Sequence, residues 1–102
     1  MTQNNRLDKR LIAHIGSAKP TLVEFYRGER AENPETITRL QGEYGDKAYV
    51  MTIDGAESQD LMATYKVATY PTFILFKDGQ EVWRDGGQKS YGELSDMIRR
   101  FI

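Results

Sequence analysis

The chain has 102 residues, and we expect residues 1–102 to form a single domain. Hydrophobic residues make up 39% and charged residues 28%, which is typical of a globular protein; the net charge of −1 gives no basic field for a nucleic acid partner. The absence of cysteine excludes disulfides, thiolate nucleophiles and Cys-ligated metals, and the lone histidine argues against a His-rich metal site.

The first predicted elements are a helix and a strand. Leu7, Leu11, Ile12 and Ile15 form one apolar helical face, which Gly16 closes. The segment 21–26 is short, β-rich and nearly all apolar, which predicts a strand buried on both faces.

A second helix and a second strand follow. Asn33 is the predicted N-cap, with Pro34 in the first turn and Gly45 at the end. The apolar stripe of this helix consists of Ile37, Leu40 and Tyr44. Residues 48–53 form the next predicted strand, which ends before Asp54-Gly55.

The second half of the chain predicts a short helix, a hairpin and a last helix. Ser58 is the expected cap of the short helix, whose buried face is Leu61, Met62 and Tyr65. Strands at 72–76 and 81–84 flank an Asp78-Gly79 turn. Ser90 and Glu93 have the spacing of a capping box, before a helix that we expect to bury Tyr91, Leu94, Met97, Ile98 and Phe101.

The resulting order, α-β-α-β-α-β-β-α, predicts a mixed sheet with helices on both faces and one antiparallel edge. Several segments also agree in order and spacing with one known family. They are the strand 22–26 with an acid at Glu24, the pair Ile53-Asp54, the run 65–67, the segment Tyr70-Pro71-Thr72, and the run 76–79. Over residues 20–101 the chain resembles the thioredoxin family. This resemblance implies a three-layer α/β/α thioredoxin fold with a sheet of four, or five, strands.

The chemistry of that family does not carry over. Its Trp-Cys-Gly-Pro-Cys motif falls on Glu29, Arg30, Ala31, Glu32 and Asn33, so Arg30 and Asn33 replace the cysteines. Disulfide exchange needs an attacking thiolate and a second sulfur, which neither residue supplies. Thiol–disulfide oxidoreduction is therefore excluded, and we expect a protein that is not an enzyme and has no cofactor.

Glu24 occupies the position of the family's buried acid, which often lies beside a lysine. Here the lysine position is Val50. One hypothesis is that desolvation raises the pKa of Glu24 and makes it a pH-sensitive acid. The alternative, which we favour, is a structural relic bonded to water or a hydroxyl.

The residues before the first helix are too few for the family's usual leading strand and turn. Without that strand, residues 48–53 would form an exposed edge, which invites a homodimer or a docking partner. The alternative is that the N-terminal residues fold over this edge.

The Tyr70-Pro71 pair is the most informative motif that remains. The resemblance implies that its peptide bond is cis and that the backbone of Thr69 and Tyr70 borders a substrate groove. The hypothesis of a peptide-binding groove includes Tyr70, Pro71, Gly86 and Gly87 around the loop at Arg30. The alternative is a turn that serves the fold alone.

Three further features have two interpretations each. Arg27 and Arg30 are candidates for holding an anion, although a solvated loop with cancelling charges fits them better. Trp83 is either an exposed anchor for a partner or a strand residue covered by the last helix. His14 has no neighbouring metal ligands and is interpreted as a surface helix residue.

These observations predict a redox-inactive protein that binds a protein or peptide as an adaptor or chaperone-like module. One alternative is a self-associating structural subunit. Another alternative is a protein that the family resemblance would assign to cell redox homeostasis, although it has no disulfide reductase activity of its own. We also expect a cytoplasmic protein with no membrane partner, since no apolar run approaches ~20 residues and residues 1–8 lack the apolar core of a secretory signal.

Overall fold

A computed structural model describes residues 11, 14–28 and 34–102 of the chain. The helices and strands assigned within these residues follow in the order β1 (Thr21–Tyr26), α2 (Pro34–Tyr44), β2 (Tyr49–Asp54), α3 (Gln59–Thr64), β3 (Thr72–Lys77), β4 (Gln80–Gly86) and α4 (Tyr91–Arg100). Before β1, Leu11, His14 and Ile15 are helical, as the sequence predicted for this region. Asn33, the predicted cap of α2, lies outside the described residues.

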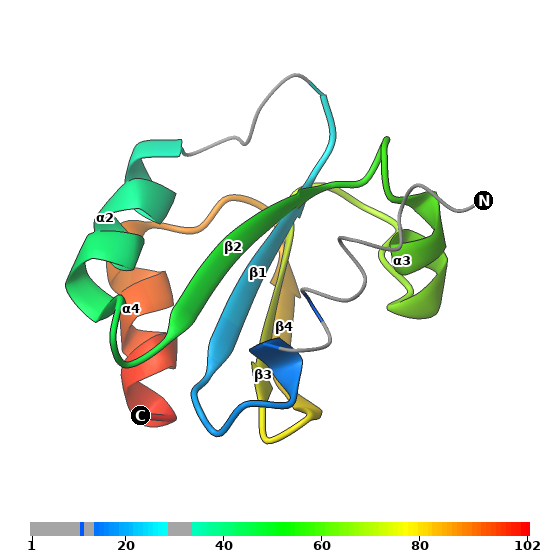
Figure 1. Cartoon of the computed structure of the whole chain (residues 1–102). Helices are drawn as coiled ribbons and strands as arrows, with labels where there is room; N and C mark the ends of the chain where they lie inside the picture. The colour runs from blue at the N-terminus through cyan, green and yellow to red at the C-terminus, as the bar shows by residue number, and fades with distance from the viewer. Residues whose placement is uncertain (1–10, 12–13, 29–33) are drawn as a thin grey trace.

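The strands form one mixed sheet in the spatial order β2-β1-β3-β4 (Figure 1). β1 pairs with β2 in parallel, and β3 pairs antiparallel with both β1 and β4. The two central strands, β1 and β3, are buried in all but their last residues, which explains their nearly continuous apolar sequences. The predicted fold class is confirmed.

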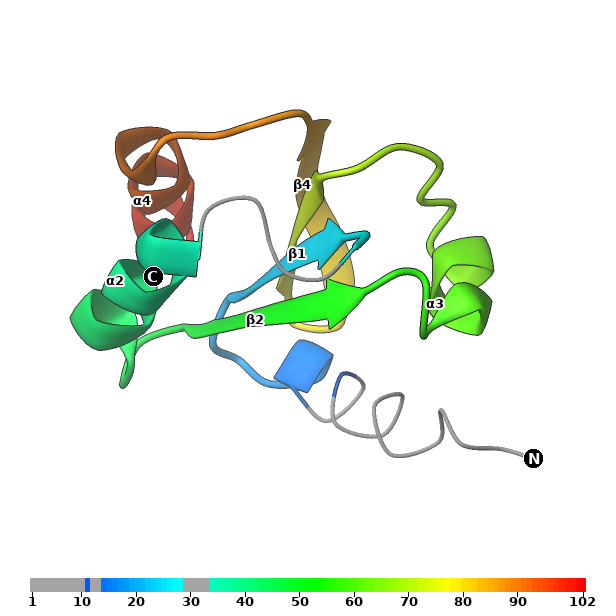
Figure 2. The same cartoon turned by 90° about the horizontal axis from the view of Figure 1, so that it is seen from above.

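Helices cover both faces of the sheet, with α2 and α4 on one side and α3 on the other (Figure 2). Two apolar clusters match this division. One contains Phe25, Ile74 and Met62 of α3, and the other contains Phe73, Leu40 of α2 and Ile98 of α4. Alternate residues of each central strand therefore supply opposite layers of the core.

The two predicted helix caps behave differently. Ser90 has an extended backbone (φ −76°, ψ 163°), and its hydroxyl accepts a hydrogen bond from the Glu93 amide. The Glu93 carboxylate accepts one in return from the Ser90 amide, so the predicted capping box is confirmed. Ser58 precedes α3 but makes no side-chain cap, and that prediction was wrong. Its ψ of 54° departs from the extended backbone usual at an N-cap.

Several boundaries and buried faces also differ from the prediction. β2 begins and ends one residue later than expected, and β4 extends to Gln80 and Gly86. The tight turn at Asp78-Gly79, where both residues have positive φ, lets β4 start directly after it. Four side chains expected to be buried are only half-buried, because they lie at the rims of the two clusters: Tyr65, Tyr91, Met97 and Phe101.

β2 forms one edge of the sheet as it is described, and it pairs there with β1 alone. Part of this edge is occupied, because the Gln41 side-chain amide donates a hydrogen bond to the Val50 carbonyl at 2.9 Å. The question of a leading strand or an N-terminal cover falls on residues 1–10, which lie outside the described residues. No helix among the described residues is long and apolar enough to cross a bilayer.

Candidate functional site

The segment between α3 and β3 contains the residues that the sequence assigned to a groove. The Tyr70–Pro71 peptide bond is cis. The Thr72 hydroxyl donates a hydrogen bond to the Thr69 carbonyl at 2.6 Å, which folds the segment back on the start of β3. Pro71 is buried, Tyr70 is half-buried and Thr69 is exposed.

The end of β4 lies against this segment. The Gly87 amide donates a hydrogen bond to the Pro71 carbonyl at 2.9 Å. A Cβ atom at Gly86 would lie 3.5 Å from the Thr69 hydroxyl oxygen and 3.9 Å from the Pro71 carbonyl oxygen. Both glycines are exposed. The structure therefore brings Thr69 and Pro71 together with Gly86 and Gly87. Tyr70 lies in the chain between the first two.

The backbone of Tyr70 bears directly on the hypothesis of a peptide-binding groove. Within the part of the chain that the structure describes, neither its amide nor its carbonyl takes part in a hydrogen bond. An extended peptide that adds to a sheet binds mainly through main-chain hydrogen bonds. It therefore needs unpaired backbone groups, such as those of Tyr70 beside the two exposed glycines.

The Tyr70 side chain extends toward the ends of β1 and β2. A Cβ atom at Gly55, just after β2, would lie 2.6 Å from the Tyr70 hydroxyl oxygen, so only glycine fits beneath the ring as it lies. The guanidinium carbon of Arg27, just after β1, is 6.0 Å from the ring centroid. The sequence analysis did not predict this contact, because it interpreted Asp54-Gly55 only as the end of a strand. A buried glycine beside a large aromatic residue is not visible before the fold is known.

After Arg27, the described part of the chain ends at Gly28 and resumes at Pro34. Gly28 has a φ of 120°, which a residue with a side chain rarely adopts, and α2 begins at Pro34. The positions of the family's active-site motif, Glu29 to Asn33, lie between them and outside the described residues. The proposed contribution of Arg30 to a groove or an anion site therefore remains a prediction.

Glu24 is fully buried in the middle of β1. It lies opposite Thr52 of β2 and Phe73 of β3, while Val50 lies opposite Leu22. Whether Glu24 is a pH-sensitive acid or a structural residue remains a prediction. At the end of the same strand, burial raises the pKa of Tyr26, and coulombic interactions with Asp54, Glu57 and Glu24 raise it further.

Two other residues from the sequence analysis can be placed. His14 is half-buried, and its ring lies edge-on to Tyr49 with centroids 4.1 Å apart, which corrects its interpretation as a surface residue. Trp83 is half-buried and packs against the cluster shared by α2 and α4. No group of three or more His, Asp or Glu side chains that could hold a metal ion occurs among the described residues.

Comparisons with known proteins agree with this architecture. The family model described as Thioredoxin matches residues 2–100. Thioredoxin C-2 of Corynebacterium nephridii is 27% identical over 103 residues, covering 96% of this chain and 94% of that relative. Thioredoxin X, chloroplastic, of Arabidopsis thaliana is 44% identical over 71 residues, which cover 67% of this chain but only 39% of that longer relative.

Solved structures give the same result. Thioredoxin NaTrxh from Nicotiana alata has a TM-score of 0.80 and 27% identity, covering 95% of this chain and 85% of that one. A cysteine-to-serine mutant of a thioredoxin from Entamoeba histolytica has a TM-score of 0.75 and 26% identity, covering 90% of this chain and 91% of that one. With its sheet order, helical layers and nearly full-length match to the family model, this cysteine-free chain belongs to the thioredoxin family.

Proposed function

We propose that this chain binds an extended peptide segment of a partner protein at the groove formed by Thr69, Tyr70, Pro71, Gly86 and Gly87, and that it is redox-inactive. The backbone of Tyr70, which makes no hydrogen bond within the described residues, is the observation that carries the proposal. A peptide laid beside it would pair with main-chain groups, and the two glycines leave room for its backbone to approach. This mode of binding suits an adaptor or chaperone-like protein.

Redox inactivity follows from the chemistry of the chain. It has no cysteine, so it has no thiolate to attack a disulfide and no second thiol to resolve a mixed disulfide. The disulfide chemistry associated with the relatives' names is therefore not part of this proposal. The expected cytoplasmic location stays a prediction, and three relatives, among them Thioredoxin X of Arabidopsis thaliana, are named as chloroplastic.

The test begins with a phage-displayed library of cysteine-free 12-residue peptides. A selected peptide is synthesised with a fluorescein label, and its dissociation constant is measured by fluorescence anisotropy. We expect its binding to shift the amide NMR signals of Thr69, Tyr70, Gly86 and Gly87. Failure to select a peptide, or shifts confined to other surfaces, would contradict the proposal.

A matched pair of variants locates the binding. A leucine at Gly86 has ordinary contact space at its Cβ but projects toward Thr69, so Gly86→Leu should weaken peptide binding at least tenfold. Gly42 lies exposed on α2 with nothing within 4 Å of an added Cβ, so Gly42→Leu should change binding less than twofold. Circular dichroism checks that both variants remain folded.

The alternative function is a self-associating structural subunit that pairs through β2. Among the described strands β2 pairs with β1 alone, which favours this alternative, although Gln41 already occupies the Val50 carbonyl. Light scattering across a hundredfold concentration range separates the two functions. The peptide-binding proposal predicts a constant mass of 11.7 kDa, and a mass that doubles with concentration would favour the alternative.

A further inference from the structure

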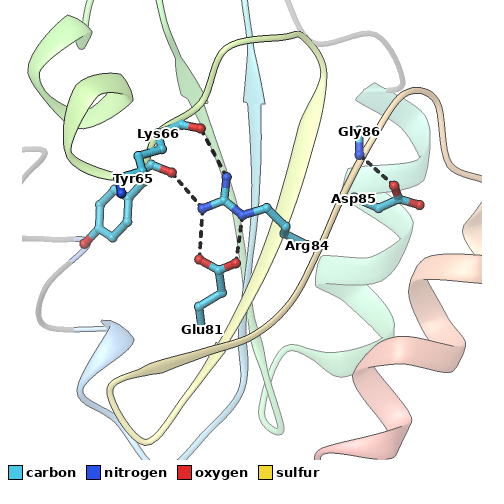
Figure 3. Close-up of polar contacts among 6 residues, drawn as sticks. All are labelled: Tyr65, Lys66, Glu81, Arg84, Asp85 and Gly86. Atoms are coloured by element: carbon cyan, nitrogen blue, oxygen red, sulfur yellow. Dashed lines mark hydrogen bonds and ion pairs between the residues drawn. The ribbon is translucent and has the colours of Figure 1, made fainter.

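Arg84 of β4 reaches across to the segment that follows α3 (Figure 3). Its guanidinium donates hydrogen bonds to the Tyr65 carbonyl at 2.7 Å and to the Lys66 carbonyl at 3.3 Å. The same group forms two hydrogen bonds with the Glu81 carboxylate, at 2.7 and 2.9 Å. One planar group therefore binds two carbonyls and one carboxylate at once, which the fork of donors on arginine allows and the single ammonium of lysine does not.

The carbonyls that Arg84 binds belong to the end of α3. This helix ends in a Schellman motif, in which the Val67 amide donates to the Met62 carbonyl and the Lys66 amide donates to the Ala63 carbonyl. Lys66 has a φ of 57°, the left-handed conformation usual for glycine at this position. The last carbonyls of a helix have no partner within it, so Arg84 supplies donors that the helix itself cannot.

This contact connects the two walls of the proposed groove. Only Val67 and Ala68 separate Lys66 from Thr69, which begins one wall. Val67 is buried and anchors the connection. On the other wall, Arg84 lies two residues before Gly86. Arg84 therefore links both walls by a second route, besides the hydrogen bond from Gly87 to Pro71.

We propose that Arg84, oriented by Glu81, is a positioning residue that sets the spacing between the Thr69–Pro71 segment and the end of β4. Its effect on binding rests on the peptide-binding function proposed above. Its effect on the unliganded protein does not, because the contacts are internal to the chain. The two effects can therefore be measured separately.

The first arm measures amide hydrogen exchange and amide NMR shifts in the unliganded protein. Arg84→Met keeps an apolar stem but removes both carbonyl contacts and the ion pair. We expect amide exchange at Lys66, Val67 and Gly87 to rise at least tenfold, with exchange in β1 unchanged. Arg99→Met is the control: Arg99 also pairs with an acid three residues before it, Asp96, but on the exposed surface of α4.

The second arm measures the affinity of the fluorescein-labelled peptide selected with the wild-type chain. Arg84→Met should weaken binding five- to tenfold. Arg84→Lys should recover part of that loss, because its ammonium still donates hydrogen bonds from one point and keeps the charge beside Glu81. Arg99→Met should leave binding unchanged. The Thr69 and Gly87 amide signals of the unliganded Arg84→Met protein should also shift, which a general loss of stability would not cause in a fully folded sample.

The outcomes separate the two proposals. Exchange at Lys66, Val67 and Gly87 that matches the Arg99→Met control would overturn the positioning role. Raised exchange with unchanged affinity would overturn the link between Arg84 and the groove. A wild-type chain that selects no peptide would overturn the proposed function, while the exchange arm would still decide whether Arg84 holds the segment.

Discussion

The ring of Tyr70 rests so closely on Gly55 that a single added carbon must displace it. A Cβ at position 55 would meet the ring and hydroxyl atoms at 2.6–2.9 Å, well inside van der Waals contact. Because Tyr70 also lies beside Arg27, displacing the ring would disturb the junction of β1, β2 and the proposed groove. The contact between the Tyr70 ring and Gly55 therefore favours glycine at position 55.

We therefore expect Gly55→Ala to lower the free energy of unfolding by about 1–3 kcal/mol, the usual range for overpacking a buried site. Gly42→Ala is the matched control, because Gly42 lies exposed in α2 with free space around it. That substitution should raise stability by about 0.5–1 kcal/mol through helix propensity. Urea denaturation measures both, and equal effects of the two changes would show that the Tyr70 ring moves aside without cost.

Lys66, just after α3, has a left-handed backbone conformation. A left-handed conformation costs a residue with a side chain roughly 1 kcal/mol, which glycine avoids. Lys66→Gly should therefore stabilise the protein by up to about 1 kcal/mol, and the Lys66 carbonyl remains for Arg84. Ala63→Gly, inside α3, should instead destabilise it by about 1 kcal/mol. Thermal unfolding distinguishes the two, and a destabilised Lys66→Gly would contradict this account.

At the scale of elements, the two serines that precede helices have different energetic roles. Ser90 closes a capping box on α4, so Ser90→Ala should cost about 1 kcal/mol of stability. The Ser58 hydroxyl is buried and makes no hydrogen bond within the described residues. Ser58→Ala should therefore change stability by less than about 0.5 kcal/mol, because no hydrogen bond is lost. Chemical denaturation of both variants checks this, and a similar loss at both positions would contradict it.

The ion pair between Arg84 and Glu81, both in β4, predicts a pH dependence. The hydrogen bonds and the charge of Arg84 lower the pKa of Glu81 below its ordinary value. The contribution of this ion pair to the free energy of unfolding is therefore complete above the pKa of Glu81 in the unfolded chain, near 4.5. It is lost as the pH falls through the lower pKa of Glu81 in the folded protein. Both side chains are about one-third exposed, so we expect no more than about 0.5 kcal/mol.

Unfolding of the wild-type chain and of Glu81→Gln, compared from pH 7 to pH 3, measures this contribution. The stability difference between them should be constant above pH 5 and shrink toward pH 3. A difference that grows on acidification would reverse the sign and contradict the assigned pKa direction.

The elements themselves were largely predictable, and the exceptions have local causes. Apolar spacing and turn residues placed β1, α2, β3 and α4, because these elements bury continuous faces or carry clear start and stop signals. The cap expected at Ser58 failed because the backbone angles of a cap depend on how the chain enters the helix, which composition does not specify. The same limit applies to Arg84, whose partners at positions 65 and 66 are nearly twenty residues away in the chain.

For the whole molecule, the absence of cysteine predicts a clear biochemical phenotype. In the insulin reduction assay with dithiothreitol, the chain should leave the rate at that of dithiothreitol alone. A cysteine-containing thioredoxin at the same concentration is the positive control and should accelerate precipitation. Acceleration by this chain, after contaminating enzymes are excluded, would contradict the redox-inactive function, because sulfur would then not be required.

Composition and local pattern alone determined the mixed sheet with helices on both faces, the order of elements and the lack of thiol chemistry, while the thioredoxin fold was implied by the family resemblance. These properties depend on residue type and short-range spacing, which the sequence states directly. Only the tertiary structure decided that Tyr70 covers Gly55, that Arg84 holds the end of α3, and that the groove residues meet at one end of β3 and β4. Such contacts join residues distant in the chain, and their geometry is fixed by how the layers pack.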